Sequence, residues 1–187
     1  MEEWLTVSLW VCQGNFRWAC AVSYNENCVR CNIIVLNVYA PSEEKNNDSK
    51  DSFYEELEQV FFYHFPKCDM KILLGNFNAK LERGDIFKQT VWNESLHKDS
   101  DDNGVRIVNF ATLNNLVIQS TMFLDWNIHK YTWTTTDWKT YNQIDRILIG
   151  RRWHSSILNV LSLRGADCNA DHNMVVADVR EILTVSK

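Results

Sequence analysis

The sequence predicts an α/β fold in which a few helices interleave with a larger number of strands. Strand-length apolar runs recur along the chain, and segments with helical periodicity separate them. The hydrophobic fraction of 45% and the charged fraction of 23% are ordinary for a folded protein. The length of 187 residues suits one domain, so we expect residues 1–187 to form a single α/β sandwich rather than a pure barrel.

The first half of the chain contains three predicted strands. Residues 15–25 read loosely as the first. Residues 32–39 form a nearly continuous apolar run that ends before Pro41, which is typical of a central strand covered on both faces. Residues 70–74 repeat this pattern, and Gly75 is expected to break the strand.

Two segments have the apolar spacing of helices. Residues 42–51 read as a solvated loop, and Ser52 with Glu55 then makes a capping box that opens the first helix, which ends before Pro66. The second helix is expected from about Gly104 to Asn114. The side chains expected to face the core are Phe53, Leu57, Val60 and Phe61 in the first helix, and Val105, Val108 and Ala111 or Thr112 in the second.

The second half of the chain adds further strands. Residues 131–135 and 143–149 flank a turn at residues 137–138, which indicates a hairpin. Trp138 occupies a turn position that would suit glycine better. The remaining strands are expected at residues 116–119, 158–163 and 174–179.

Charge and the N-terminus limit the classes of function. The net charge of -5 means that DNA binding would need a local basic patch or a divalent ion. No apolar stretch approaches a membrane span, so no membrane partner is expected. The first residues, Met-Glu-Glu, are acidic where a secretion signal is basic. We therefore expect an intracellular protein, in the nucleus or the cytoplasm and not secreted; its oligomeric state stays open.

The six cysteines are interpreted as free thiols. Without a secretion signal, disulfides are disfavoured, so no disulfide-linked partner is expected. Cys28 and Cys31 have the spacing of a zinc or redox site, but the sequence has neither a second such pair nor a His pair after them. We expect two packed thiols near a hairpin.

Polar residues lie at or just beyond the ends of several predicted strands, where rigid scaffolds present reactive groups. Each of them alone would suit an ordinary surface turn. Their order along the chain is more specific than any single one. These residues are Tyr39, Asn76, Asn78, Asp145, Asp171 and His172.

Four ordered blocks around these residues resemble the endonuclease/exonuclease/phosphatase, or DNase I-like, family. More closely, they resemble the endonuclease domains of LINE- and RTE-type retrotransposons, over roughly residues 30–187. The blocks are NVYAP at 37–41, LLGNFNA at 73–79, QIDRIL at 143–148 and ADH at 170–172.

The resemblance implies a four-layered sandwich of two mainly antiparallel sheets, packed face to face, with helices outside. It also implies Mg²⁺-dependent cleavage of a phosphodiester, with the DNA backbone as the partner. Chemically, a water must be deprotonated and aimed at phosphorus, and the charge on the phosphoryl oxygens must be stabilised. The same scaffold also supports phosphatases on small phosphate esters, so fold alone does not decide the substrate.

The family pattern implies a role for each matching residue. Asp145 would orient His172, which would contact the scissile phosphate. Tyr39 would present its hydroxyl to that phosphate, and Asn78 would orient the nucleophile or the phosphate. Thr132 lies where the family places a small hydroxyl residue near the phosphate.

The metal site follows from the same comparison, whereas the backbone contacts follow from basic residues that cluster in the C-terminal third of the chain. Asp171, Asn76 and Asn78 would belong to the Mg²⁺ site. Arg146 would bind the phosphate backbone, and with Arg151, Arg152, Arg164 and His154 it could line a groove beside Asp145. The alternative for this basic set is a solvated face. Asp99, Asp101 and Asp102 are interpreted as a surface turn.

Two departures from the family pattern bear on activity. Asn76 occupies the aspartate position of a Gly-Asp-Phe-Asn motif, and an amide cannot take a proton from water. Losing a positioned general base costs about 10²–10⁴ in rate. The early Asn and the metal-binding Glu of the family cannot be placed, nor can the strands that carry them; whether Glu2 or Glu3 replaces that Glu stays open.

Three functions therefore remain. One is an endonuclease of retrotransposon descent, active or weakly active. Another is an inactive relic that binds phosphate, nucleic acid or a protein. The third is a phosphatase. We expect an endonuclease-derived domain that is impaired rather than competent.

Overall fold

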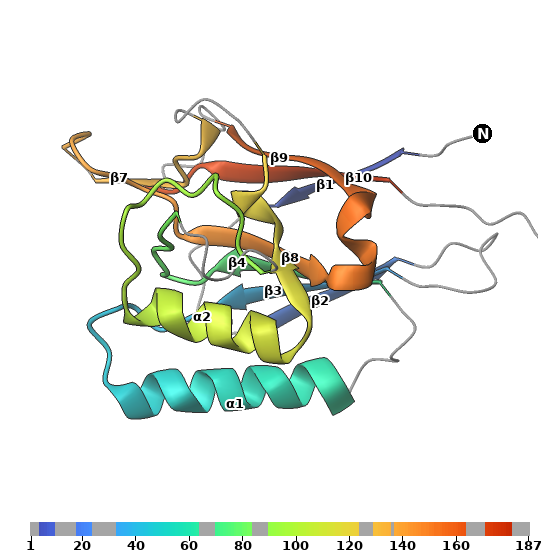
Figure 1. The fold of residues 1–187 in the computed structure, drawn as a ribbon, viewed down its shortest axis with the longest axis horizontal. Coiled ribbons are helices and arrows are strands. Elements are labelled where there is room, and N and C mark those ends of the chain that lie inside the picture. Colours follow the sequence, from blue (N-terminus) through green and yellow to red (C-terminus); the bar gives the residue numbers. More distant parts are fainter. Residues whose placement is uncertain are drawn as a thin grey trace, which may run out of the picture.

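Two β-sheets and two α-helices make up most of the computed structural model (Figure 1). The structure describes residues 4–9, 18–23, 33–63, 70–83, 90–123, 129–135, 137–163 and 171–180. The Cys28–Cys31 pair, Glu2, Glu3 and Arg164 lie outside the described residues.

The larger sheet has five strands, with the continuous apolar runs at its centre. β3 and β4 run parallel, whereas the other neighbouring strands run antiparallel. The predicted central strand is confirmed, but β4 continues through Gly75 instead of breaking there. In spatial order the strands are β2 (Trp18–Ser23), β3 (Ile33–Tyr39), β4 (Met70–Asn76), β8 (Asp145–Gly150) and β5 (Leu116–Ile118).

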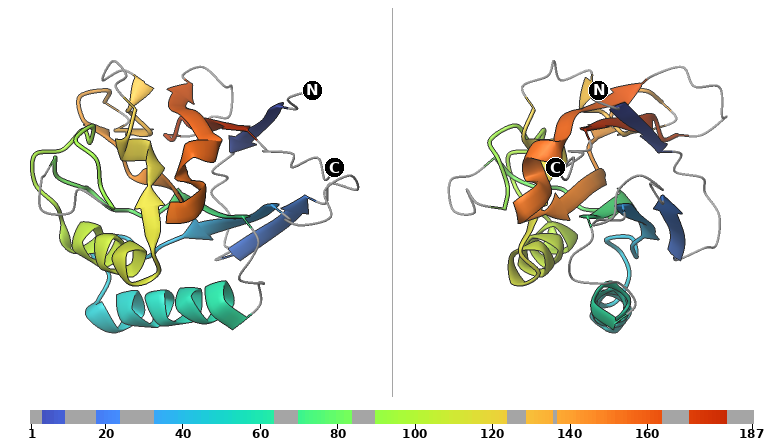
Figure 2. Two further views of the ribbon diagram at one scale, coloured as in Figure 1. Left: turned by 45° about the vertical axis from the view of Figure 1, so that its right-hand side comes forward. Right: turned by 90° about the vertical axis from the view of Figure 1, so that its right-hand side faces the viewer.

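The smaller sheet has three antiparallel strands and packs face to face with the larger one (Figure 2). Its two C-terminal strands confirm the sequence prediction. Its edge strand near the N-terminus was not predicted from the sequence. In spatial order the strands are β1 (Trp4–Leu9), β10 (Met174–Arg180) and β9 (Ile157–Leu163).

The apolar core forms two layers, one on each face of the larger sheet. Between the sheets, Ile72, Leu74 and Ile147 pack with Val175 and Val179 of β10. On the other face, α1 (Asn47–Tyr63) and α2 (Asp102–Leu113) cover the sheet (Figures 1 and 2). The sandwich of packed sheets with outer helices is therefore confirmed, with both described α-helices on the same side.

Both helices differ from the sequence prediction at their ends. α1 begins five residues before Ser52, because the Asn46 side chain accepts a hydrogen bond from the Ser49 N–H at 3.1 Å and caps it. Asp101 caps α2 by accepting from the Gly104 N–H at 2.7 Å. Val105, expected inside, is 51% exposed, because the buried face runs through Ile107, Val108, Phe110 and Ala111 instead.

The predicted hairpin pairs shorter strands than expected. β6 (Trp133–Thr134) pairs with β7 (Tyr141–Asn142), and Trp138 in their connection has a φ of 58°. The following residues leave the hairpin as β8 and enter the larger sheet between β4 and β5. β8 is buried along almost its whole length, and the neighbouring strands β4 and β5 supply the hydrogen-bond partners of its backbone.

Short 3₁₀ helices connect the last elements. η1 (Gln119–Thr121) follows β5, and η3 (Arg151–Ser156) joins β8 to β9. Among the described residues, none of the helices has both the length and the apolar character that a membrane crossing requires.

Candidate functional site

The candidate site lies at one end of the larger sheet, where three adjacent strands bring together residues far apart in sequence. Tyr39 ends β3, Asn76 ends β4, and Asp145 begins β8. The register pairs Tyr39 with Asn76, and Asn76 with Asp145. Because β8 runs antiparallel to the other two, its first residue meets their last residues. Asn76 and Asp145 are each 1% exposed, whereas Tyr39 is 40% exposed at the rim.

Asp145 is joined to His172 as the resemblance implies. The His172 Nδ1 lies 2.9 Å from the Asp145 Oδ2. His172 reaches this position because it bridges to Trp133 of β6, and the Asn173 N–H donates to the Thr132 carbonyl at 2.8 Å. An imidazole whose Nδ1 donates to a carboxylate keeps its Nε2 available for a ligand.

Thr132 holds the start of β8 in place. Its Oγ1 accepts hydrogen bonds from the N–H groups of Ile144 and Asp145, at 3.0 and 3.1 Å. Thr132 is 3% exposed. Its hydroxyl therefore positions the Asp145 backbone, instead of presenting itself to a phosphate as expected from the sequence.

Asp171 faces the hairpin. Its Oδ2 accepts a hydrogen bond from the Trp133 Nε1 at 2.6 Å, and its carbonyl accepts from the Thr134 N–H at 2.9 Å. These bonds fix the segment before His172 along β6. They leave Asp171 beside the His172–Asp145 pair, with one of its carboxylate oxygens engaged.

Asn76 and Asn78 form a tight local turn after β4. The Asn76 Oδ1 accepts from the Asn78 N–H at 2.7 Å, and Asn78 has a φ of 47°, in the left-handed region that Asn tolerates. The Asn78 Nδ2 donates to the Ala40 carbonyl at 2.8 Å, which ties the end of β4 to the end of β3. A carboxylate at position 76 could accept the same N–H, so the turn does not depend on the amide.

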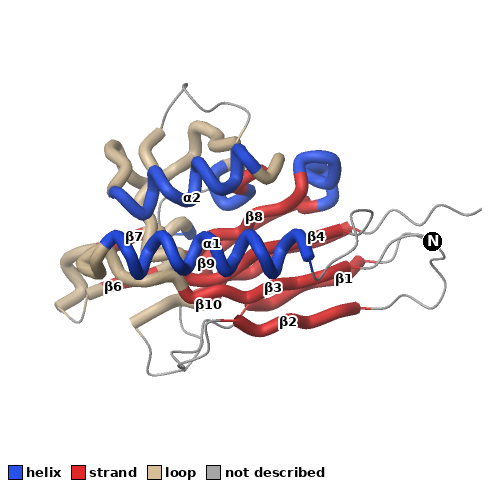
Figure 3. Tube along the Cα trace, turned by 90° about the horizontal axis from the view of Figure 1, so that it is seen from below, coloured by secondary structure: helices blue, strands red, loops and turns tan. Residues whose placement is uncertain are grey.

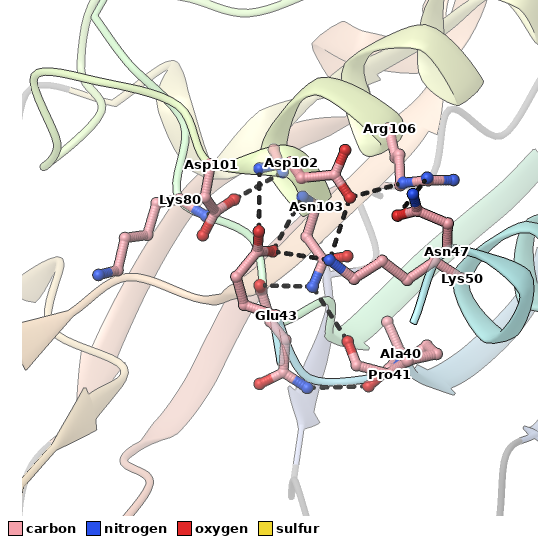
Figure 4. A network of polar contacts seen from close by, with 12 residues as sticks. Ala40, Pro41, Glu43, Asn47, Lys50, Lys80, Asp101, Asp102, Asn103 and Arg106 are labelled. Carbon is pink, nitrogen blue, oxygen red and sulfur yellow. Dashed lines mark hydrogen bonds and ion pairs between the residues drawn. The ribbon is translucent and has the colours of Figure 1, made fainter. Parts of the chain in front are cut away.

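Asn103 is a site residue that the sequence analysis missed. Its Nδ2 donates to the carbonyls of Pro41 and Asn78, at 3.0 and 3.1 Å, and its side chain is 1% exposed (Figure 4). One amide thus joins the loop after Tyr39 to the loop after Asn76. The signal in the sequence was weak, since an Asn in the first turn of a helix is common.

Carboxylates and a buried lysine surround the Asn103 amide. The Glu43 carboxylate accepts from the N–H groups of Asp102 and Asn103, at 3.3 and 3.1 Å (Figure 4). The Lys50 Nζ lies 3.3 Å from Glu43 and 3.0 Å from Asp102. Burial disfavours the Lys50 charge, but these two partners outweigh burial and raise the pKa of Lys50. A carboxylate at a helix N-terminus is also favourable, so the loop after β3 docks firmly on α2.

Asn103→Ala is expected to lower the free energy of unfolding by about 2 kcal/mol, because two carbonyls lose their donor. Asn109→Ala, on the exposed face of the same helix, is the matched control and is expected to change stability by less than about 0.5 kcal/mol. Urea unfolding followed by circular dichroism measures both. Equal midpoints for the two variants would show that Asn103 does not hold the loops together.

The electrostatics favour a charged His172. Burial opposes the imidazolium, but the hydrogen bond to Asp145 and the charges of Asp145 and Asp171 outweigh burial and raise its pKa above the ordinary value of 6.5. The stabilisation from this pair is complete below pH 6.5 and is lost as pH rises through the raised pKa. A protonated imidazole at this position would suit an anionic ligand.

The pKa of His97, which lies in the loop of residues 90–101, shifts in the opposite direction. Burial, and then the charges of Arg146 and Lys80, lower the pKa of His97 to about 4, and its Nε2 accepts from the Gln143 N–H at 3.2 Å. The unfolded chain binds a proton near pH 6.5, so acid favours unfolding between pH 6.5 and pH 4.

Stability is therefore expected to fall by roughly 1 kcal/mol from His97 alone as pH drops from 6.5 to 4, after allowance for its partial exposure. The check is urea unfolding at both pH values for the wild-type chain and for His97→Gln, which keeps an acceptor for Gln143. His129→Gln is the exposed control. An equal pH slope for the wild-type chain and His97→Gln would refute this role.

The structure places the basic residues differently from the groove expected beside Asp145. Arg146 is fully buried, and its Nη2 donates to the Ala79 carbonyl at 3.2 Å. Burial lowers the pKa of Arg146 to about 9, although Asp145 and Asp101 oppose the shift. Because successive residues of a strand point to opposite faces, Arg146 lies on the helix-covered side and cannot reach a surface phosphate.

The other described basic residues lie at the far end of β8 from Asp145. Arg151, Arg152 and His154 belong to η3, which follows the last residue of β8 (Figure 1). Arg151 donates to the Asn115 Oδ1 at 2.9 Å, and Arg152 stacks over the Trp153 ring. This set does not line the candidate site.

The described residues offer an incomplete Mg²⁺ site. The Asn76 Oδ1 is already bonded to the Asn78 N–H, and the Asp171 Oδ2 to Trp133. No group of three or more His, Cys, Asp or Glu side chains in the described ranges could hold a metal. The expected set of Asp171, Asn76 and Asn78 contributes one carboxylate, which is a weak donor set for Mg²⁺.

Comparison with solved structures shows which known proteins share the fold of this chain. The chain superposes on the endonuclease domain of TRAS1, a telomere-specific non-LTR retrotransposon, with a TM-score of 0.57 at 14% identity, covering 88% of this chain and 64% of that one. It also superposes on a 3′–5′ exonuclease (NExo) from Neisseria meningitidis, with a TM-score of 0.57 at 17% identity. This match covers 94% of this chain and 79% of the exonuclease.

The chain has the DNase I-like fold of the endonuclease/exonuclease/phosphatase proteins. The catalytic domain of Xenopus laevis APE2 shares this fold, with a TM-score of 0.54 at 19% identity, covering 80% of this chain and 51% of that one. The fold expected from the four sequence blocks is therefore confirmed.

Curated relatives with closer sequences are longer proteins. The chain is 33% identical over 155 residues to craniofacial development protein 2 from Bos taurus, and 32% identical to the same protein from Tragulus javanicus. The match covers 80% of this chain and 25% of each relative, so this DNase I-like chain spans about a quarter of their length. No protein-family model matches the sequence.

Proposed function

We propose that this chain is a phosphodiester-hydrolysing domain of endonuclease type and retrotransposon descent, acting on the DNA backbone, with its hydrolytic step impaired by Asn76. The observation that supports it is the 2.9 Å contact between His172 and Asp145, next to Asn76 in the register of β4 and β8. The proposal includes weak Mg²⁺ binding and an intracellular location, in the nucleus or the cytoplasm.

The retained residues suit recognition of a phosphodiester. Asp145 holds the His172 ring through Nδ1, so that Nε2–H donates to a phosphate oxygen. The raised pKa of His172 favours the charged form of that donor, and a charged donor binds an anionic oxygen more strongly than a neutral one. Tyr39, exposed at the rim, adds a hydroxyl from the neighbouring strand.

The step that is weakened is deprotonation of the attacking water. Asn76 lies between Tyr39 and Asp145, in the position of the family's aspartate, and its amide oxygen is engaged by the Asn78 N–H. An amide does not accept a proton near neutral pH. Binding of a phosphodiester therefore survives at this site, while its hydrolysis slows by about 10²–10⁴.

A second function, binding without turnover, is favoured by a separate observation. The described residues lack a cluster of three metal-ligating side chains. A DNA-binding module would need the His172–Asp145 pair but no general base. The phosphatase NExo shares the fold and was solved with a product DNA hairpin, so a 3′-phosphate is the phosphatase substrate to compare.

The experiment measures binding and cleavage separately. Fluorescence anisotropy with a labelled DNA duplex gives the affinity, and conversion of supercoiled plasmid to open circles with Mg²⁺ gives the cleavage rate. His172→Ala should weaken binding and abolish residual nicking, whereas Lys139→Ala, an exposed hairpin variant, leaves the pair intact. Release of phosphate from a 3′-phosphorylated oligonucleotide or an inositol phosphate without nicking would favour a phosphatase. Binding that does not change in His172→Ala would refute the proposed site.

A further inference from the structure

Lys80 lies in the loop that follows β4, shortly after Asn76, and has no role in the function proposed above. This loop lies at the end of the sheets that carries the β6–β7 hairpin (Figure 3). The Lys80 N–H donates to the Asp101 Oδ1 at 3.0 Å, and the Lys80 carbonyl accepts from the Asp101 N–H at 3.3 Å. A Cβ added at Gly104 would lie 2.0 Å from that carbonyl oxygen, so α2 packs directly on the Lys80 backbone. The base of the side chain is therefore held in one place.

The Lys80 ammonium differs from those of the other described lysines that are at least partly buried. Lys50 and Lys130 are buried, and each ammonium contacts a carboxylate oxygen, at 3.0 and 2.8 Å. The half-buried Lys71 donates to the Phe61 carbonyl at 3.0 Å. Lys80 is also half-buried, yet its ammonium has no acceptor within the described part of the chain. Because charged groups drawn partly out of water normally have a partner, this ammonium is suited to an anion from outside.

The Lys80 ammonium is open to solvent, so a ligand can reach it. It is not one of the solvent-inaccessible polar atoms without a partner that occur elsewhere in the described ranges. Figure 4 shows the Lys80 side chain extending away from the carboxylates of Asp101 and Glu43 instead of joining their network. The ammonium therefore stays available to an anion that approaches from the surface.

The charge of Lys80 lies on the side of the loop that meets the start of β8. Burial is the main cause of the lowered pKa of His97, and the charges of Arg146 and Lys80 lower it further. The His97 Nε2 in turn accepts from the Gln143 N–H at 3.2 Å, two residues before Asp145. Lys80 thus places a positive charge near the strand end that carries the candidate site.

We propose that Lys80 is a further DNA-binding residue, whose ammonium binds an oxygen of a phosphate next to the one that His172 contacts. This inference rests on the proposed function, since it places both side chains on the same DNA backbone. A chain with a net charge of -5 needs local cations to hold a polyanion. An ammonium is a compact charge that recognises phosphate and reads no base, so Lys80 strengthens binding without adding sequence preference.

The test measures the affinity of the whole chain for a labelled DNA duplex by fluorescence anisotropy at several KCl concentrations. Lys80→Gln should weaken binding about 3- to 10-fold. It should also reduce the slope of log affinity against log salt by about one, because one fewer phosphate is neutralised. The loss should be equal for two duplexes of unrelated sequence, since a phosphate contact carries no sequence information.

Two matched variants separate a local contact from net charge. Lys80→Arg keeps the charge and should retain the salt slope. Arg152→Gln removes one positive charge from η3, at the far end of β8, and should leave the affinity and the slope unchanged. An equal loss in Lys80→Gln and Arg152→Gln would contradict the proposal, because net charge alone would then explain it.

The His172→Ala variant distinguishes failure of this inference from failure of the proposed function. If His172→Ala binds more weakly while Lys80→Gln keeps the wild-type affinity and slope, the role of Lys80 is refuted and the proposed function stands. A loss confined to one of the two duplexes would indicate a base contact and would also overturn the inference. If His172→Ala binds as the wild-type chain does, the proposed site is wrong, and the shared backbone contact of Lys80 and His172 is wrong with it.

Discussion

Asn76→Asp is expected to nick supercoiled plasmid in Mg²⁺ at least about 10²-fold faster than the wild-type chain, because it restores a carboxylate that can take the proton of the attacking water. The new side chain is nearly isosteric and can still accept the Asn78 N–H, so the turn after β4 is retained. The added carboxylate also strengthens the donor set for Mg²⁺. Initial rates from agarose gels measure the gain.

Two controls show where that gain arises. Adding His172→Ala to Asn76→Asp should remove it, since the imidazole that would contact the phosphate is lost. Asn76→Ala keeps neither a base nor an acceptor for Asn78 and should stay inactive. If the Asn76→Asp chain folds with a normal circular dichroism spectrum and still fails to cut DNA, the endonuclease proposal is wrong.

The largest expected loss of stability is for Gly75→Ala, roughly 3–5 kcal/mol in the free energy of unfolding. Gly75 has a φ of 136°, a conformation that residues with a Cβ rarely adopt. An added Cβ would lie 2.0 Å from the carbonyl oxygen of Val38 and 2.8 Å from its nitrogen. Both atoms belong to the backbone of the neighbouring central strand, so they cannot move aside without disrupting the sheet.

Gly150→Ala is the matched control at the other end of the sheet. Its added Cβ would meet only the Trp153 Cδ1 at 3.6 Å, an ordinary van der Waals distance. Urea unfolding should therefore separate the two variants clearly, with Gly150→Ala close to the wild-type midpoint. Similar midpoints would mean that the close approach of β3 and β4 at Gly75 does not limit stability.

Much of the fold could be predicted because the hydrophobic pattern of a segment reports its local structure. The continuous apolar run before Pro41 became the central strand β3, and Phe53 and Leu57 became the buried face of α1. The pattern reports boundaries less well. Asn46 caps α1, so the helix begins earlier than a cap at Ser52 would place it. The apolar pattern cannot distinguish between two possible capping residues.

The sequence pattern also could not predict strand partners. Residues 143–149 seemed to complete a hairpin by proximity in the chain, yet β8 lies in the larger sheet, where its apolar side chains are buried on both faces. The edge strand β1 was missed although Leu5, Val7 and Leu9 have the alternate spacing of a strand, and its partner β10 lies near the other end of the chain. Long-range pairing decided both cases.

The sequence by itself determined the fold class, because four short blocks in a fixed order can be recognised without knowledge of their contacts. Only the tertiary structure decided what the candidate site residues do together. It joined His172 to Asp145, turned Thr132 into a support for the backbone, and buried Arg146 on the helix-covered side of the sheet. The physical reason is that strand register and sheet face set which side chains meet, and both depend on partners distant in the chain.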